Sequence, residues 1–507
     1  MTRPSRPAKK SSIRKICVCQ TISNKKNHPL IKNIPVTTMV QKTKRRAHAF
    51  HKAVSQFRET VQPYFQGMVQ PETPSAKPLK LVPVVPPHLT RERDALESSY
   101  ASRLSERADY RKLVTYVPNK TIPVYNWFKY KEGFSRQLVV NLVEKFALSK
   151  HSIVYDPFVG CGTTILACKE LGLMGIGTDI LDVALFVAGV KCARFPAVQI
   201  LSAATAKLLR VPYKPPTSSM ADIRIVGLAF SSQVRDEILF FKERITEADA
   251  ATRDFLLLGL VSVLEDVSHT SKDGQFLRLV DKHIPTVREA LRQVYAVMLA
   301  DLSSLFTSCS NGKGKTLVLK GDARAGCLPP RYNGTIDAVI TSPPYLNRYD
   351  YSRSYALELC LLSVASHRDM VAVRHSLLRS HIESKEHSGK EVVLPALDEI
   401  LTNLRAKELN NQRLPIMVQG YFEDMNLVIA NLALYLKHGG HVALVVANAQ
   451  FAGEYVPTDL LLCELARQHG LETNEIWITR YKGNSSQQMA VYGRRPVRES
   501  ILFWRKP

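Results

Sequence analysis

The residues best suited to chemistry lie in a short loop, TSPPY (341–345), that follows the apolar run IDAVI. Pro343 and Pro344 remove two backbone N–H donors and stiffen the chain, which leaves their carbonyls as acceptors. The Ser342 hydroxyl and the Pro343 carbonyl could accept hydrogen bonds from both protons of an exocyclic amino group. Its nitrogen would become more tetrahedral, and its lone pair could then attack a sulfonium methyl group. Tyr345 offers a flat face for an extruded base, so this catalytic loop suits a reaction that depends on in-line positioning.

A second motif, the glycine-rich loop DPFVGCGTT (156–164), follows an apolar run and opens a segment with helical spacing. Gly160 and Gly162 let the backbone approach a ligand closely, and the following helix N-terminus supplies free N–H groups. In a doubly wound sheet, a cofactor binds at this place, outside the carboxyl ends of the strands. The third glycine of the dinucleotide fingerprint is absent, which disfavours nicotinamide cofactors. A bare G-x-G also occurs in many tight strand-to-helix turns.

Three aspartates end successive predicted strands: Asp156, Asp179 and Asp322. Asp179 could accept hydrogen bonds from both ribose hydroxyls of a nucleoside, and Asp322 could meet an adenine amino group. Each aspartate alone is more often a helix cap or a turn residue. Their common position at three strand ends indicates a nucleoside site.

The segments around these motifs alternate between apolar strands and helices. The predicted strands are 152–158, 174–180, 316–323, 336–345 and 441–448, and the predicted helices are 90–105, 163–172 and 421–436. Gly439-Gly440 is predicted to stop the last of these helices. Apolar strands that alternate with helices imply an α/β fold with a doubly wound, mostly parallel, Rossmann-like sheet. Residues 475–481 and 499–505 are predicted to form an antiparallel hairpin that closes the edge of the sheet.

Together, DPFVGCGTT and TSPPY resemble the motifs of the amino-methyltransferase family of DNA modification enzymes, which make N4-methylcytosine or N6-methyladenine. A third stretch, YKEGFSRQLV (130–139), is similar to the family's K-E-x-F-S segment, which closes over the methionine end of the cofactor. The resemblance implies S-adenosylmethionine as the cofactor and a Rossmann-like methyltransferase fold. It assigns Phe134, Ser135, Asp156, Phe158 and Gly160 to cofactor binding. With the residues proposed above, the cofactor site comprises Phe134, Ser135, Asp156, Phe158, Gly160, Gly162, Thr163, Asp179 and Asp322, the catalytic loop contributes Ser342, Pro343, Pro344 and Tyr345, and no metal is expected.

A serine before Pro-Pro-Tyr resembles the N4-cytosine members more than the adenine members. The predicted function is therefore site-specific DNA methylation at cytosine N4, with adenine N6 as the alternative base. An RNA base amino-methyltransferase and a catalytically inactive DNA-binding protein of the same fold remain alternatives. Double-stranded DNA is the expected partner, together with a cognate restriction nuclease of the same system.

The composition agrees with a nucleic-acid partner. The chain holds 69 Lys and Arg against 45 Asp and Glu, a formal net charge of +24, and residues 1–60 contain fifteen of the basic residues and one acid, Glu59. Such a balance favours an anionic partner. No C-x-x-C pair and no apolar run of membrane-spanning length are present, so we expect a reduced, prokaryotic cytoplasmic protein without a membrane segment.

Two insertions interrupt the alternation of strands and helices. The sequence divides into a basic, poorly ordered tail (1–75), a linker and helix (76–120), the cofactor half of the methyltransferase domain (121–195), a helical insertion (196–313), the catalytic-loop half (314–361), a second helical insertion (362–419), and the end of the domain with its hairpin (420–507). Because the cofactor loop precedes the catalytic loop, target recognition falls to an insertion or to the C-terminal part, and the first insertion is favoured. Candidate nucleic-acid contacts are Lys272 and Arg278 in the first insertion and Arg348 and Arg353 after the catalytic loop. Solvated loops that cap helices are the alternative interpretation of both stretches.

Overall fold

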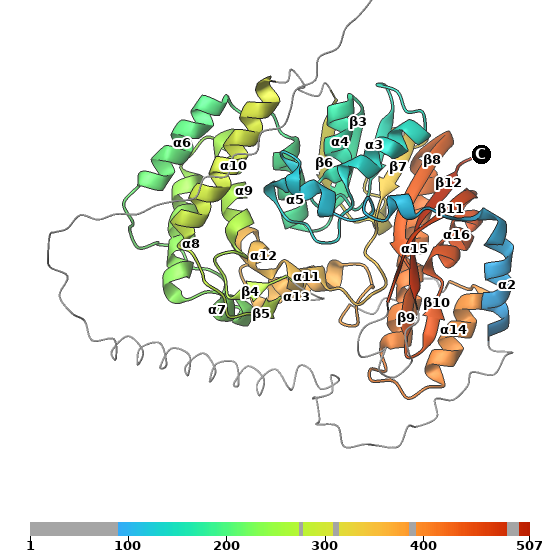
Figure 1. Ribbon diagram of the computed structural model, residues 1–507. Helices are drawn as coiled ribbons and strands as arrows, with labels where there is room; N and C mark the ends of the chain where they lie inside the picture. Colours follow the sequence, from blue (N-terminus) through green and yellow to red (C-terminus); the bar gives the residue numbers. More distant parts are fainter. Residues whose placement is uncertain (1–89, 273–276, 308–313, 385–391, 484–495) are drawn as a thin grey trace, which may run out of the picture. The chain divides into compact units, whose positions relative to one another are not determined.

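An eight-stranded sheet forms the centre of the protein in the computed structural model, which describes residues 90–272, 277–307, 314–384, 392–483 and 496–507 (Figure 1). The strands of this sheet are β1 (Leu104–Glu106), β2 (Ile153–Asp156), β3 (Met174–Asp179), β6 (Thr316–Lys320), β7 (Ile336–Thr341), β8 (Leu436–Ala447), β11 (Glu472–Lys482) and β12 (Val497–Arg505). Their order is β1-β11-β12-β8-β7-β2-β3-β6, and only β12 runs antiparallel to its neighbours. The predicted doubly wound, mostly parallel sheet is confirmed.

The predicted hairpin forms, but the prediction that it closes the sheet is wrong. β12 lies between β8 and β11, and β1 pairs with β11 at the edge. The apolar run of β12 explains its central place: Ile501 packs on one face of the sheet and Leu502 on the other, and both are fully buried. Strands buried on both faces carry such continuous apolar runs. The helix predicted over 90–105 is shorter in the structure, because α2 ends at Tyr100 and Leu104 begins β1.

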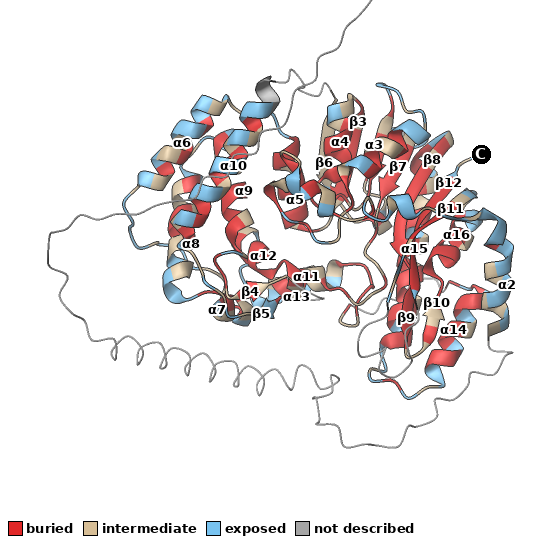
Figure 2. Ribbon diagram, in the orientation of Figure 1, coloured by how far each residue is buried: buried red, intermediate tan, exposed pale blue. Residues whose placement is uncertain are grey.

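Helices cover both faces of the sheet, and Figure 2 shows that the strands and the helix faces against them are buried. The helices are α2 (Arg91–Tyr100), α3 (Arg136–Lys145), α4 (Thr163–Leu171), α5 (Asp182–Cys192), α6 (Val198–Arg210), α7 (Arg224–Ala229), α8 (Ser232–Thr246), α9 (Ala250–Val263), α10 (Val287–Thr307), α11 (Tyr351–Ser354), α12 (Ala356–Leu362), α13 (His367–Ser376), α14 (Pro395–Arg405), α15 (Leu414–Tyr435) and α16 (Thr458–Gln468). On one face, α3 and α4 pack against alternate residues of the central strands. On the other, α14, α15 and α16 pack against the intervening residues. None of the helices that the structure describes is long and apolar enough to cross a membrane.

The end of α15 differs from the prediction. The helix passes directly into β8 at Leu436, and Gly439 and Gly440 lie within that strand rather than at a helix stop. Leu436 already pairs with Ile336 of β7, while the next pair joins Ala338 to His441, so the glycines occupy a bulge. Gly439 has a positive φ of 76°, which a glycine adopts without strain.

The first insertion is helical, as predicted, and α8, α9 and α10 are its three longest helices. It shares one apolar core with α5 and α12, so it does not pack as a separate body. Its short strands β4 (Thr270–Ser271) and β5 (Arg278–Leu279) pair with each other. The other short pair, β9 (Ala449–Phe451) and β10 (Glu454–Val456), follows β8.

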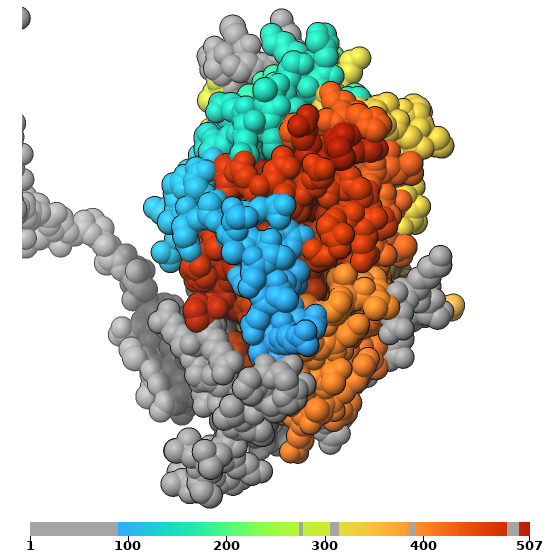
Figure 3. Space-filling view, turned by 90° about the vertical axis from the view of Figure 1, so that its right-hand side faces the viewer, coloured from blue at the N-terminus to red at the C-terminus, as the bar shows by residue number. Residues whose placement is uncertain are grey.

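Helix α2, at the beginning of the described chain, packs against elements from its C-terminal part (Figure 3). Arg93 on α2 forms an ion pair with Glu399 of α14, with 2.7 Å between Nε and Oε1. Arg498 of β12 pairs with Glu97 of α2 and, at 2.6 Å, with Asp459 of α16. The described residues all belong to one compact unit.

Candidate active site

A pocket lies at the carboxyl ends of β2, β3, β6 and β7, the place at which a doubly wound sheet binds its ligand. The predicted site residues that line it are Phe134, Asp156, Phe158, Gly160, Thr163, Asp179, Asp322, Ser342 and Pro344. The predicted site residues that do not line it are Ser135, Gly162, Pro343 and Tyr345. The glycine-rich loop, all three strand-end aspartates and Ser342 thus meet around one cavity.

Both glycines of the glycine-rich loop have positive φ, 49° at Gly160 and 85° at Gly162. A Cβ at Gly160 would lie 3.0 Å from the Tyr130 ring, at the pocket. A Cβ at Gly162 would lie 3.0 Å from the Cβ of Ala188 on α5. Gly160 therefore keeps the pocket open, while Gly162 begins α4 and allows it to pack closely on α5.

Asp156 ties three elements together beneath the pocket. Its carboxylate accepts hydrogen bonds from the hydroxyls of Thr164 and Thr341, both at 2.7 Å, and from the Phe158 N–H at 3.1 Å. Burial raises the pKa of Asp156 to about 6, against the lowering effect of these three bonds. The side chain therefore joins the end of β2 to α4 and to the catalytic loop.

Asp179 ends β3 and shapes the glycine-rich loop directly. Its Oδ2 accepts a hydrogen bond from the Gly160 N–H at 3.0 Å, and its Oδ1 accepts from Ile180 and Leu181 at 2.8 and 3.0 Å. Burial raises the pKa of this carboxyl group, and the three N–H donors oppose the rise. A carboxylate has about four acceptor positions, so Asp179 keeps capacity for a hydroxyl group in the pocket.

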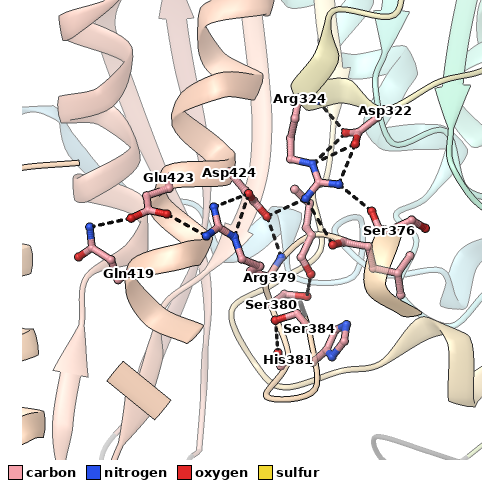
Figure 4. Close-up of polar contacts among 12 residues, drawn as sticks. Asp322, Arg324, Ser376, Arg379, Ser380, His381, Ser384, Gln419, Glu423 and Asp424 are labelled. Atoms are coloured by element: carbon pink, nitrogen blue, oxygen red, sulfur yellow. Dashed lines mark hydrogen bonds and ion pairs between the residues drawn. The ribbon is translucent and has the colours of Figure 1, made fainter. Parts of the chain in front are cut away.

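Asp322 lines the pocket while it is bound by Arg324. Two nitrogens of the guanidinium donate to the carboxylate, with an Nη2–Oδ2 distance of 2.7 Å (Figure 4). The same guanidinium bonds to the Ser376 carbonyl at 2.7 Å and to Asp424 of α15 at 3.1 Å. Asp424 also holds Arg379, at 2.7 Å. This network fixes residues 376–380, the pocket wall, of which Arg379 alone does not line the cavity.

The segment before α3 forms another side of the pocket. Phe134 lines the cavity, whereas the fully buried Ser135 caps α3 and accepts from the Leu138 N–H at 3.2 Å. Asn119 holds both ends of this turn: its Nδ2 donates to the Phe134 carbonyl at 3.0 Å, and its Oδ1 accepts from the Arg136 N–H at 2.8 Å. Ser135 thus fixes the shape of the segment from outside the cavity.

The catalytic loop is anchored by the C-terminal strands. The Tyr345 hydroxyl donates to Glu499 of β12 at 3.0 Å. Glu499 is 1% exposed and also pairs with Arg480 and Lys482 of β11. The Lys482 ammonium lies 5.3 Å from the centre of the Tyr345 ring. Ser342 and Pro344 therefore line the pocket beside a tyrosine whose hydroxyl end is fixed.

An aromatic group that is not among the predicted site residues borders the same cavity. Tyr130 and Tyr355 stack with ring centres 5.0 Å apart, and Tyr351 lies nearly parallel, 6.4 Å from each. Tyr130 and Tyr351 line the pocket. Tyr351 and Tyr355 are four residues apart, a spacing that places side chains on one helix face and could have revealed the pair.

Two of the four predicted nucleic-acid contacts, Lys272 and Arg353, form ion pairs with acidic side chains. The Lys272 side chain is 8% exposed, pairs with the buried Glu358, and lies 4.7 Å from the centre of the Tyr355 ring. Arg353 pairs with Glu383 and, at 3.4 Å, with Asp350. Arg278 is exposed on β5, and Arg348 follows the catalytic loop directly.

Comparison with known proteins finds DNA methylases. A family model described as DNA methylase matches residues 23–185. The Type II methyltransferase M.BsoBI of Geobacillus stearothermophilus is 34% identical over 475 residues, which cover 82% of this chain and 92% of that protein. M.AvaI of a Nostoc species is 32% identical over 465 residues, covering 83% and 94%. A solved methyltransferase structure from Methanosarcina mazei aligns over 72% of this chain and 96% of its own at 9% identity, but its TM-score of 0.25 is too low to carry an argument.

Proposed function

Because the chain belongs to the DNA amino-methyltransferase family, we propose that it methylates the exocyclic N4 of cytosine within a specific sequence of double-stranded DNA. The observation that carries this proposal is the position of Ser342, which lines the same pocket as Asp179 and Gly160. One cavity is therefore bordered both by a hydroxyl that can accept a hydrogen bond from an amino group and by residues suited to bind a nucleoside.

S-adenosylmethionine is the cofactor of this family, and the residues of the pocket fit it. Asp179 has acceptor capacity for ribose hydroxyls. Asp322 can accept from the adenine amino group, and Phe134 borders the side assigned to the methionine end. When bound, the cofactor supplies an electrophilic methyl group.

The chain's own residues would prepare the target amine. We assign the Ser342 hydroxyl and the Pro343 carbonyl as acceptors for its two protons, which frees the nitrogen lone pair. Glu499 fixes the Tyr345 hydroxyl, so the ring is held ready to stack on an extruded base. No strong base is required, since positioning supplies most of the rate.

The choice of cytosine rests on the serine before Pro-Pro-Tyr. Digestion of methylated plasmid DNA to nucleosides, followed by mass spectrometry, tests it: N4-methylcytosine is expected. N6-methyladenine would overturn the choice of base, and labelling of RNA but not of DNA would overturn the choice of substrate. A cognate restriction nuclease would share the recognised sequence, and its cleavage of unmethylated but not methylated DNA is the corresponding test.

The role of Ser342 is tested by Ser342→Ala. This variant should bind the cofactor nearly as the wild type does but transfer methyl groups about 100- to 1,000-fold more slowly, as for loss of one preorganised polar contact. Single-turnover transfer of a labelled methyl group measures the rate. A variant with the wild-type rate would remove Ser342 from the mechanism.

For target recognition, we propose that the first insertion reads the sequence while the basic segment at residues 1–38 adds general affinity. Sequence reading needs side chains held rigidly against base edges, and charge alone attracts phosphates anywhere. Since Lys272 is internal, Arg278 is the candidate to test there. Methylome sequencing should show an altered motif for Arg278→Ala and an unaltered one after deletion of residues 1–38; the reverse result would overturn the assignment.

A further inference from the structure

Arg348, three residues after Tyr345, has a left-handed backbone with φ of 66°. For a residue with a Cβ atom, this conformation is strained, and such strain gathers at functional sites. Neighbouring contacts hold it in place: the Arg348 N–H donates to the Ser380 carbonyl at 3.0 Å, and the Tyr349 N–H donates to Asn347 at 3.0 Å. The loop therefore presents the Arg348 side chain from a fixed, strained position beside the catalytic loop.

The guanidinium of Arg348 is partly buried without an acid to balance it. Its Nε is buried and has no hydrogen-bond partner, and its Cζ lies 5.3 Å from the centre of the Phe451 ring on β9. Burial lowers the pKa of Arg348, and none of the carboxylates in the described residues forms an ion pair with it. A guanidinium nevertheless stays protonated in proteins.

Three other arginines on the segments near Arg348 form ion pairs with acidic side chains. Arg374 pairs with Asp350 at 2.9 Å, Arg379 pairs with Asp424 at 2.7 Å, and Arg353 pairs with Glu383. Burying a charge without a partner is unfavourable, so the chain bears a cost at Arg348 that it avoids at its neighbours. A cation kept unmatched in the free protein is suited to an anion that arrives with the substrate.

We propose that Arg348 binds a backbone phosphate of the DNA beside the target nucleotide. The proposal rests on DNA as the substrate, and it places an anion-binding site next to the loop that holds the base. A phosphate matches the forked N–H donors of arginine and would supply the missing acceptor for Nε. The Phe451 ring supports the guanidinium from the side of β9 and leaves its donors to the DNA.

Binding of the full-length protein to a duplex that carries the methylated sequence, measured by fluorescence anisotropy over a range of salt concentrations, tests this inference. Arg348→Gln should weaken binding on the order of 10-fold, as for loss of a charged hydrogen bond. A plot of the logarithm of the binding constant against the logarithm of the salt concentration has a negative slope, and its magnitude should decrease by about 0.9. The methylated sequence should stay the same. Arg348→Lys keeps the charge but not the forked donors, so its DNA affinity should lie between those of the wild type and Arg348→Gln.

Arg331→Gln is the matched control. Arg331 is exposed and lies before the amino end of β7, whereas the catalytic loop follows the carboxyl end of that strand, so loss of Arg331 should leave the salt slope unchanged. If Arg348→Gln binds DNA like this control, or if it changes the methylated sequence, the phosphate assignment is wrong. A lower midpoint of thermal unfolding for Arg348→Gln would instead indicate a structural role, since removal of an unmatched charge should not destabilise the fold. Failure of the wild type to methylate DNA would overturn the proposed function itself, so the two failures are distinguishable.

Discussion

The Asp156 carboxylate accepts a 2.7 Å hydrogen bond from the hydroxyl of Thr341, the residue immediately before Ser342. The two residues end neighbouring parallel strands, β2 and β7. Asp156 also starts the glycine-rich loop, so a single buried side chain sets the spacing between the cofactor pocket and the catalytic loop. A methyl transfer that depends on alignment needs such a fixed spacing.

Asp156→Asn should change how stability depends on pH. The pKa of Asp156 is about 6 in the folded protein and 3.8 for the free group, so between these values only the folded state holds the proton. Its stabilising contribution is therefore complete below pH 3.8 and is lost as the pH rises through 6. The free energy of unfolding of the wild type should fall by about 3 kcal/mol relative to the Asn variant over this window.

Urea unfolding of both proteins between pH 4 and 7 measures this difference. Asp254→Asn, at a partly exposed position on α9, is the control and should follow the wild type. Parallel pH profiles for the wild type and Asp156→Asn would contradict the prediction.

Asp179→Ala should weaken S-adenosylmethionine binding by about 1.5–3 kcal/mol, because a charged acceptor for a ribose hydroxyl is lost. Calorimetry measures the affinity. Asp179→Asn should weaken binding less, since it can still accept from the Gly160 N–H. DNA affinity without cofactor should barely change in either variant. A variant that binds the cofactor normally and DNA poorly would show that Asp179 has been assigned to the wrong ligand.

Tyr345 and Glu499 should be coupled in catalysis. Tyr345→Phe removes the donor of the 3.0 Å hydrogen bond and Glu499→Leu removes its acceptor, so each should lower kcat with little change in cofactor affinity. The double variant should lose less than the sum of the two single losses in activation free energy, since the bond can be lost only once. Fully additive losses would mean that Glu499 acts only through Arg480 and Lys482.

Lys272→Met should destabilise the fold by about 3–5 kcal/mol, because it leaves Glu358 buried without a counter-charge. Lys272→Met combined with Glu358→Gln should recover most of the loss. Urea unfolding measures both variants. If Lys272→Met unfolds like the wild type but binds DNA poorly, the lysine is free to contact DNA in solution, and the ion pair is not its main role.

The sequence alone was enough to predict the strand-end aspartates. Asp156, Asp179 and Asp322 each follow a local apolar run, and parallel strands bring their carboxyl ends to one edge. The partners of these aspartates were harder to predict when they come from distant segments. Arg324 lies two residues from Asp322 and could have been noticed, whereas residues 376–380 reach the pocket only through the packing of the second insertion on α15.

The contacts of Glu499 and Lys272 were not predictable for the same reason. Glu499 meets Tyr345 because β12 inserts between β8 and β11, a pairing that no local pattern specifies. Lys272 stands in a polar stretch that is typical of an exposed loop. Its carboxylate partner and the aromatic ring beneath it come from Glu358 and Tyr355, in a helical segment far along the chain.

The three-residue strand β1 has a consequence for solubility. It pairs with Ile476, Trp477 and Ile478 of β11, whose backbone groups would otherwise form an open, apolar sheet edge. Open edges of this kind recruit strands from other molecules. A chain cut before α3 would keep the catalytic loop and the glycine-rich loop, yet it would expose a template for aggregation. In the full chain β1 is the edge strand, and its exposed Glu106 places a charge there, which discourages the addition of another strand.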